Sequence, residues 1–335
     1  MKKRSQVIHS LTTEQQLVET IKSWAGGSFI GDDCAVLPGG LLVTTDTLVE
    51  GTHFSSSWTS FRDIGWKACA ANLSDVAAMA GRPRHIVVAL TIPTDFKRTD
   101  LRDFYRSLVE CARTYRAQVV GGDLTRGPAF IINLTVLGHV HENGCLTRSG
   151  ARTGDVVVVT GDFGASAAGL WLLQQGCDTP TRKQFAYCLE RHEHPLPRVC
   201  EAWALVRNTG NRGALMDASD GLADALVQIA RQSAVAMDID FDAVPVHGQT
   251  REIAQLAGIE LSDWVLYGGE DYELVGTLSE QVWQKWQGQP DNPFVCIGKV
   301  TDGAKVRLRS HESGELTVDL SKCFQQVSEK LREST

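Results

Sequence analysis

The sequence lacks several features that mark particular classes of protein. No apolar run approaches the roughly 20 residues of a membrane-spanning helix, and the basic start MKKRSQVIHS leads into polar LTTEQQ rather than the apolar core of a signal peptide. We therefore expect neither export nor membrane insertion. The nine cysteines include no C-x-x-C pair, and an odd, scattered set indicates neither a disulfide framework nor a zinc cluster. These absences favour the reducing cytoplasm.

The local signatures of several ligand-binding folds are also missing. There is no G-x-x-x-x-G-K-[ST] loop, GDFGASAAG at 161–169 lacks the G-x-G-x-x-G spacing, and neither G-x-S-x-G nor D-x-[DN]-x-[DN]-G occurs. Walker-type and Rossmann nucleotide binding are therefore not indicated. Excess positive charge is absent too, because 33 Lys and Arg stand against 40 Asp and Glu, a net charge of −7. This balance argues against nucleic acid as a partner, and a phosphorylated ligand would need a cation.

What the sequence does have is the composition of a soluble globular protein. Its 335 residues are 43% hydrophobic and 22% charged, and this length suffices for two domains. Because a chain of this size buries about 75% of its unfolded surface, we expect hydrophobic cores rather than disulfides or structural metals to stabilise it.

The first part of the chain alternates helical and strand patterns. Helices are predicted where apolar residues recur at helical spacing, and strands where short apolar runs occur. We predict helices over 12–24, 63–79 and 99–116, and strands over 86–93, 118–123 and 130–140. A further strand is predicted from Leu41, with TTDT at 44–47 at its end. This order predicts an α/β sandwich domain.

A polar, turn-rich segment, LTRSGARTGD at 146–155, separates this part from a second one. We place the boundary after residue 148, which predicts an N-terminal α/β domain over 1–148 and a C-terminal α/β domain over 149–335. The second domain is predicted to hold a strand at VVVVTG, helices over 165–173 and 199–206, a connector at 192–198, and a strand, turn and helix in ALMDASDGLADALVQIARQ. Further strands are predicted near 234–241, 271–277, 293–299 and 305–309.

Six short acidic motifs, nearly all at Gly-rich turns beside apolar strands, are the unusual feature. They are GDD at 31–33, TTDT at 44–47, NLSD at 72–75, GGD at 121–123, DASDG at 217–221 and GGEDYE at 268–273. Mg²⁺ binds carboxylate, hydroxyl and phosphate oxygens, and glycine lets the backbone approach a phosphate. Because gathered carboxylates repel one another without cations, the set indicates a metal and phosphate site.

Each motif alone has a simpler interpretation, because Asp and Gly commonly form turns together. Ser219 or Asp220 can cap the helix that follows them, a role compatible with phosphate at its free N–H groups and metal at Asp217 and Asp220. His53 is either a surface histidine or a phosphate contact. Arg148 suits bidentate phosphate contact, although solvated turn arginines are commoner.

Taken together, these motifs resemble the thiamine-monophosphate kinase family. The resemblance spans residues 30 to about 300 and rests on IGDDCAV, TTDTLVEGTHF, ANLSDVAAMAG, GGDLTRG, LTRSGARTGD, DASDGL and YGGEDYEL. The family shares a superfamily with aminoimidazole ribonucleotide synthetase, selenophosphate synthetase and a hydrogenase-maturation dehydratase. The resemblance implies their two-domain mixed α/β fold, ATP use without a P-loop, and a homodimer formed by the N-terminal domains. It also implies direct in-line phosphorylation of thiamine monophosphate to thiamine diphosphate with several Mg²⁺ ions, the last step in making that cofactor.

The family's functional residues carry over motif by motif. The implied metal ligands are Asp33, Thr44, Thr45, Asp46, Asp75, Asp123, Asp217 and Asp220. The implied nucleotide contacts are Tyr105, Gly122, Asp123, Arg148 and Ser219, and the implied substrate contacts are His53, Glu270 and Phe324. Two positions depart from the family pattern. Ala218 stands where Leu or Ile is commoner, and the segment VDLSKCFQQV offers only Phe324 as the aromatic substrate contact. Phosphoryl transfer depends on positioning and charge neutralisation, so no catalytic base is required.

Two other interpretations remain. Another ATP-using member of the superfamily is less well supported, because the sequence lacks an N-terminal Gly-rich cysteine segment and ends in LREST rather than in cysteine. A non-catalytic protein that binds divalent cations such as Ca²⁺ would also explain acidic clusters, although calcium sites usually draw their oxygens from one compact loop.

Overall fold

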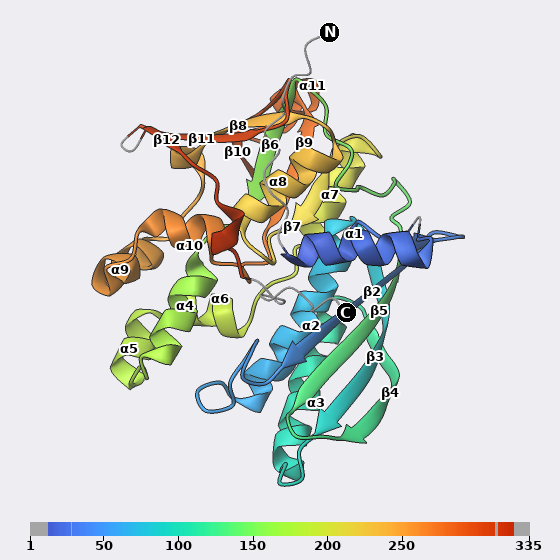
Figure 1. Cartoon of the computed structure of the whole chain (residues 1–335), viewed down its shortest axis with the longest axis vertical. Helices are drawn as coiled ribbons and strands as arrows, with labels where there is room; N and C mark the ends of the chain where they lie inside the picture. Colours follow the sequence, from blue (N-terminus) through green and yellow to red (C-terminus); the bar gives the residue numbers. More distant parts are fainter. Residues whose placement is uncertain (1–12, 28, 312–313, 325–335) are drawn as a thin grey trace, which may run out of the picture.

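The computed structural model describes residues 13–27, 29–311 and 314–324. They form two β-sheets with helices packed against them (Figure 1). The first sheet has the spatial order β1 (Ala35–Leu37), β2 (Leu41–Val49), β5 (Ile131–His139), β3 (Arg82–Ile92) and β4 (Gln118–Arg126). Only β3 and β4 are parallel among these neighbours, because α3 (Arg98–Thr114) carries the chain back between them.

One face of this sheet is covered by α3 and by α2 (Phe61–Ala78). Ser60 begins α2 as its N-cap, since its hydroxyl accepts the main-chain N–H of Asp63. Small residues then let other elements approach this helix closely, and a Cβ on Gly65 would lie 2.2 Å from the main-chain oxygen of Phe104 in α3. The same helix also contacts the second half of the molecule, through α6, α7 and β7.

The other face of the first sheet is open. Thr45 and Thr47 of β2 are exposed on it. On the edge strand β4, Val120 is 53% exposed. Side chains of paired residues on neighbouring strands point to the same side, so the pairing of Thr47 with Asn133, Asn133 with Ala89 and Ala89 with Asp123 places Asp123 on this open face.

The second sheet has seven strands, in the order β12-β11-β8-β10-β6-β9-β7. Their bounds are β6 (Asp155–Thr160), β7 (Leu215–Asp217), β8 (Ala236–Asp240), β9 (Leu274–Ser279), β10 (Phe294–Thr301), β11 (Val306–Ser310) and β12 (Gly314–Leu316). The valines of β6 are buried on both faces, because Val157 and Val159 pack with α8 and α10 while Val156 and Val158 pack with α7 and α11.

The helices of the second half surround this sheet. They are α4 (Ala165–Gln174), α5 (Thr179–Gln184), α6 (Ala186–Glu193), α7 (Val199–Thr209), α8 (Leu222–Gln232), α9 (Gly248–Ala257), α10 (Leu261–Tyr267) and α11 (Glu280–Trp286), with short 3₁₀ turns at Phe241–Ala243 and Leu320–Lys322. In the described residues, no helix has the length and apolar character to cross a bilayer.

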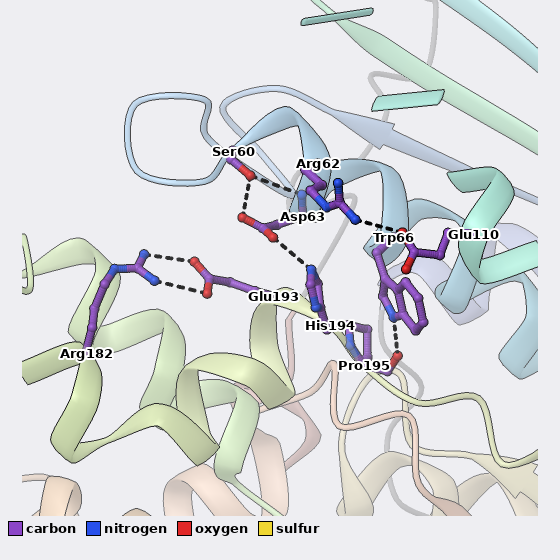
Figure 2. A network of polar contacts seen from close by, with 9 residues as sticks. All are labelled: Ser60, Arg62, Asp63, Trp66, Glu110, Arg182, Glu193, His194 and Pro195. Atoms are coloured by element: carbon purple, nitrogen blue, oxygen red, sulfur yellow. Dashed lines mark hydrogen bonds and ion pairs between the residues drawn. The ribbon is translucent and has the colours of Figure 1, made fainter. Parts of the chain in front are cut away.

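The two halves are joined by side chains of α2 and by α1 (Thr13–Ala25). The indole N–H of Trp66 donates to the main-chain oxygen of Pro195 over 2.9 Å, and His194 lies 2.8 Å from the Asp63 carboxylate (Figure 2). The first helix lies alongside α8, where Gln15 donates to Asp224 over 2.8 Å (Figure 1). The relative position of the two halves is therefore set by specific polar contacts.

Several sequence predictions need correction. TTDT does not end its strand but lies in the middle of β2, which continues through the apolar Leu48 and Val49. The short edge strands β1 and β12 were missed because three residues carry no readable periodicity. Helices α5, α6, α9, α10 and α11 were missed as well, since all are short and four have fewer than ten residues.

Candidate active site

The GDD turn presents its second carboxylate to an arginine from the segment that links the two sheets. Asp33 accepts two hydrogen bonds from the Arg148 guanidinium, over 2.7 Å from Nη2 and 3.3 Å from Nε. The main-chain N–H of Arg148 donates to Asp32 over 2.8 Å. Burial alone would lower the pKa of Arg148, but the Asp33 charge raises it, so this side chain stays cationic. Three of its five N–H donors remain for a ligand.

A second group of polar side chains comes from β2 and α2. The Thr44 hydroxyl donates to Asp75 over 2.5 Å, and the main-chain N–H of Asp46 donates to Asn72 over 3.1 Å. Thr44 and Asp46 face α2 because residues two apart on a strand share a face. Burial, followed by the nearby Asp33 charge, raises the pKa of Asp46 to about 6.

The second half of the molecule adds Asp217, which is fully buried at the end of β7. It accepts hydrogen bonds from Ser74 over 2.5 Å and from Ser219 over 3.2 Å. Burial and the Asp33 charge raise its pKa to about 7. Two serines thus orient a carboxylate that a neighbouring negative charge makes costly to ionise.

Asp33, Asp75 and Asp217 meet at one point. Each offers a carboxylate oxygen, and the three oxygens all lie within 4.8 Å of one another. Burial, and after it the repulsion from neighbouring carboxylates, raises the pKa values of Asp75 and Asp217, and a divalent cation would remove this repulsion. With the Thr44 hydroxyl beside them, these hard oxygen donors fit Mg²⁺ in residue type and in spacing.

Ser219 and Asp220 lie beside this cluster at the start of α8. Gly221 precedes the helix with φ +105°, and no side chain of the described residues caps it, so N–H groups of its first turn remain available. Burial, then Asp224, raises the pKa of Asp220 to about 8. A pocket of about 170 Å³ opens here between α1 and α8, and Arg148, Ser219, Asp220 and Phe324 all line it.

The predicted substrate residues His53 and Phe324 touch each other. Their ring centroids lie 5.9 Å apart in an edge-to-face arrangement. Nδ1 of His53 accepts the main-chain N–H of Val49 over 3.0 Å, so the ring proton lies on Nε2. Nε2 is buried, and among the described residues it has no hydrogen-bond partner. An unpaired buried donor at this position calls for a ligand acceptor.

Glu270, the third predicted substrate residue, is held by a lysine. Its Oε1 lies 2.7 Å from Nζ of Lys67 in α2, and its Oε2 lies 3.7 Å from Nδ1 of His192 in α6. Burial would raise the pKa of Glu270, but the Lys67 charge and then His192 lower it, so the carboxylate is ionised at neutral pH.

Four of the predicted site residues lie away from the carboxylate cluster in the folded structure. Thr45 and Asp123 lie on the open face of the first sheet, where Thr45 is within 3.2 Å of the Thr135 hydroxyl. Gly122 pairs with Val88, and a Cβ there would lie 1.9 Å from the Val88 main-chain oxygen, so close strand packing by itself requires glycine. Tyr105 lies on α3 beside Phe104, and burial raises its pKa.

Three further residues at the site, Lys67, His192 and Asp224, were not predicted from the sequence. Lys67 could have been noticed as a single cation in the small, apolar stretch IGWKACAA of a predicted helix. Nothing local distinguished His192 from the other residues of HEHPLPR, and Asp224 resembled an ordinary acidic residue in the first turn of a helix.

Comparison with known proteins identifies the family. The profile of the AIR synthase related protein, N-terminal domain, matches residues 31–140, and that of its C-terminal domain matches residues 152–311. The chain is 37% identical to thiamine-monophosphate kinase of Synechococcus elongatus over 93% of this chain and 95% of that protein. It is 35% identical to the Bacillus subtilis kinase over 90% and 92%.

Solved structures agree with this assignment. AaThiL complexed with AMPPCP and TMP has a TM-score of 0.80 and 30% identity, covering 89% of this chain and 94% of that chain. Thiamine monophosphate kinase from Aquifex aeolicus has a TM-score of 0.79 and 30% identity over 89% and 96%. The predicted fold class and family resemblance are thereby confirmed, and the chain belongs to the thiamine-monophosphate kinase family of the AIR synthase related proteins.

Proposed function

We propose that this kinase transfers the terminal phosphoryl group of ATP to the phosphate of thiamine monophosphate, in line and with Mg²⁺, to give thiamine diphosphate. The observation that carries the proposal is the convergence of Asp33, Asp75 and Asp217 from both halves of the chain, beside the Arg148 guanidinium. The AaThiL structure, which holds AMPPCP and TMP, supports this choice of nucleotide and acceptor.

The carboxylate cluster is the place for the metal. Several Mg²⁺ ions would be held by Asp33, Thr44, Asp46, Asp75, Asp217 and Asp220. Such ions would neutralise the charge of the phosphates and orient the two phosphates toward each other. Because the pKa values of Asp46 and Asp217 are raised to about 6 and about 7, these carboxylates hold a metal best above neutral pH.

Arg148 and the start of α8 bind the nucleotide phosphates. The guanidinium uses two N–H groups on Asp33, and because Arg148 lines the pocket, the others would serve the phosphate group on which charge develops. Ser219 and the free N–H groups that follow Gly221 add donors at the positive end of the helix dipole.

The open face of the first sheet explains the remaining predicted ligands if two copies pair through it. Three strand spacings, about 14 Å, separate β2 from β4, so Asp123 of one chain cannot share an ion with Asp46 of the same chain. We propose a homodimer through this face, in which Thr45, Gly122 and Asp123 complete the nucleotide site across the interface. The exposed Val120 on the edge strand β4 supports such a contact. Tyr105 on α3 lies on the opposite side of the sheet, so its predicted nucleotide contact is not explained by this interface.

The acceptor lies against His53, Glu270 and Phe324. The N–H at Nε2 of His53 donates a hydrogen bond to the acceptor phosphate, the Phe324 ring packs on the heterocycle, and the Glu270 carboxylate accepts a hydrogen bond from the amino group of that heterocycle. Alignment of two phosphates by fixed donors is the main work in such a transfer.

Direct transfer fits the chemistry of the pocket. Cys323 is the thiol that lines it, and burial raises its pKa to about 12, so at neutral pH it is no nucleophile for a phospho-enzyme. The acceptor phosphate is ionised already and needs no base.

The domain limits and the cellular location remain predictions. A boundary after residue 148 is supported by the first sheet, which ends at His139, and the second, which begins at Asp155. The cytoplasmic location rests on the nine cysteines, all of which are free.

The test is a panel of acceptors incubated with ATP and Mg²⁺. Thiamine monophosphate, thiamine, an aminoimidazole ribonucleotide precursor and a mixture without acceptor are compared by quantifying nucleotide and thiamine products. We expect thiamine diphosphate only from thiamine monophosphate. ADP release with another acceptor, and none with thiamine monophosphate, would refute the proposal and favour another ATP-using member of the superfamily.

A further inference from the structure

Lys67 is a buried cation placed between the two halves of the molecule. Its side chain is 3% exposed, on the face of α2 that meets α6. Nζ lies 2.7 Å from Oε1 of Glu270 and 3.3 Å from Nε2 of His192. A lysine held this tightly cannot reach a ligand directly, so any role in the reaction acts through its partners.

The hydrogen-bond pattern fixes the protonation of His192. Because the lysine ammonium can only donate, Nε2 of His192 accepts, and the ring proton lies on Nδ1, 3.0 Å from the Ser166 hydroxyl. Burial, then the Lys67 charge, lowers the pKa of His192 to about 3, so the ring is neutral. The cluster therefore contains one cation and one anion, Lys67 and Glu270.

Glu270 is also fixed at its backbone. It has φ +55°, and its main-chain N–H donates to the Ser219 oxygen over 2.6 Å. The next residue, Asp271, accepts the N–H groups of Gly164 and Ser166 over 2.8 and 3.1 Å at the start of α4. A left-handed residue whose own N–H is bonded and whose next neighbour is anchored has little freedom to move, so the direction of its side chain is set.

The two carboxylate oxygens of Glu270 have different surroundings. Oε1 is bonded to Lys67, whereas Oε2 is 3.7 Å from His192, too far for a hydrogen bond. The Glu270 side chain is 28% exposed, so Oε2 keeps lone pairs for an external donor. One oxygen is therefore a structural anchor and the other is available for recognition.

We propose that Lys67, oriented by His192, is a positioning residue that holds Glu270 ionised and aims Oε2 at the amino group of the acceptor heterocycle. The inference rests on the proposed function, since it assigns Glu270 to thiamine monophosphate. It adds a specificity mechanism: an acceptor without a hydrogen-bond donor on its heterocycle leaves the carboxylate unpaired and is rejected.

The test compares Lys67→Met, Glu270→Gln, the double variant and Lys67→Arg by steady-state kinetics and thermal melting. Lys299→Met is the matched control, because Lys299 forms an exposed ion pair with Glu280 over 3.2 Å. We expect Lys67→Met and Glu270→Gln each to raise KM for thiamine monophosphate about tenfold or more, with kcat and KM for ATP changed less than about threefold. The double variant should match either single variant, and Lys67→Arg should recover part of the loss.

The double variant also guards against simple misfolding, because it contains no unpaired buried charge. If Lys67→Met lowers the melting temperature while KM for thiamine monophosphate stays at the wild-type value, Lys67 is only structural and the inference fails. The inference also fails if the increase in KM for thiamine monophosphate in the double variant equals the product of the increases in the two single variants. A wild-type enzyme that makes no thiamine diphosphate refutes the proposed function itself, and this inference with it.

Discussion

Asp33 and Arg148 form a two-point ion pair across 115 residues of sequence, at 2.7 and 3.3 Å. The pair joins the GDD turn to the segment between the two sheets, and Asp33 in turn lies with Asp75 and Asp217. A carboxylate that would bind metal and a guanidinium that lines the pocket are thus fixed relative to each other. Metal and nucleotide phosphate are therefore expected to bind cooperatively.

Replacing Arg148 by lysine should separate charge from geometry. Lysine keeps the positive charge but cannot make the two parallel contacts, so we expect kcat/KM for ATP to fall about 100-fold. The control is Arg231→Lys, since Arg231 lines the same pocket but pairs with the exposed Glu19. That control should stay within about twofold of wild type. Wild-type kinetics in Arg148→Lys would contradict the role of the ion pair.

The carboxylate cluster predicts opposite effects of pH on the metal-free and the Mg²⁺-bound protein. Asp46 and Asp217 have pKa values raised from 3.8 to about 6 and about 7 in the folded protein. The folded state then binds more protons than the unfolded state between pH 3.8 and 7. Without metal, the free energy of unfolding of the protein should therefore fall as pH rises through this range. Mg²⁺ binds the ionised form, so its stabilising effect should grow over the same range.

Thermal melting from pH 5 to 8, with and without Mg²⁺, measures both effects. In Asp217→Asn the metal-free melting temperature should depend less on pH, and added Mg²⁺ should raise it less. A Mg²⁺ effect that is equal at pH 5 and pH 8 would count against metal binding by these carboxylates.

The ion pair between Asp63 and His194 should stabilise the contact of the two halves within a defined pH window. Asp63 raises the pKa of His194 above 6.5, whereas hydrogen bonds from His194 and Ser60 outweigh burial and lower the pKa of Asp63 below 3.8. The histidine contribution is lost as pH rises through its raised pKa, and the aspartate contribution as pH falls through its lowered one. The pair is therefore most effective between pH 3.8 and 6.5.

We expect Asp63→Asn to lower the free energy of unfolding by about 1 kcal/mol at pH 6 and by less at pH 8.5. Arg62→Gln is the control, because its ion pair with Glu110 lies beside the first one but is largely exposed (Figure 2). Chemical denaturation at the two pH values checks both variants. An Asp63→Asn effect that is larger at pH 8.5 would show that the histidine charge is irrelevant.

Phe324 tests whether the aromatic wall of the acceptor pocket is correctly assigned. Removing the ring in Phe324→Ala should raise KM for thiamine monophosphate about tenfold and change KM for ATP by a smaller factor, because the ring packs on His53. Phe324→Trp should retain activity. The exposed Phe29, changed to alanine, is the control. If KM for thiamine monophosphate does not change in Phe324→Ala, another residue forms this wall.

The sequence predicted the long, periodic elements and the acidic turns, but it did not predict which of these turns lie together in the folded chain. DASDG, NLSD and GDD do meet, through Asp217, Asp75 and Asp33. GGD does not join them, because β4 is an edge strand at the far side of the first sheet. Strand order depends on pairing between distant segments, and local patterns do not contain it.

The same limit applies to GGEDYE. Its three acidic residues point to three different partners, Lys67 for Glu270, the start of α4 for Asp271 and Arg198 for Glu273. The positive φ of Glu270 and Tyr272 causes this divergence, and neither residue type favours such a conformation. Lys67 and His192, 125 residues apart, could be connected only in the folded chain.

The most direct test of the account is the stoichiometry of ADP and thiamine diphosphate, measured in the same mixture over a Mg²⁺ series for wild type, Asp46→Asn and Asp217→Asn. The account predicts equal amounts of both products from wild type, saturating with Mg²⁺, and at least about 100-fold less from either folded variant. Wild-type rates in the two variants, or ADP without thiamine diphosphate, would contradict it.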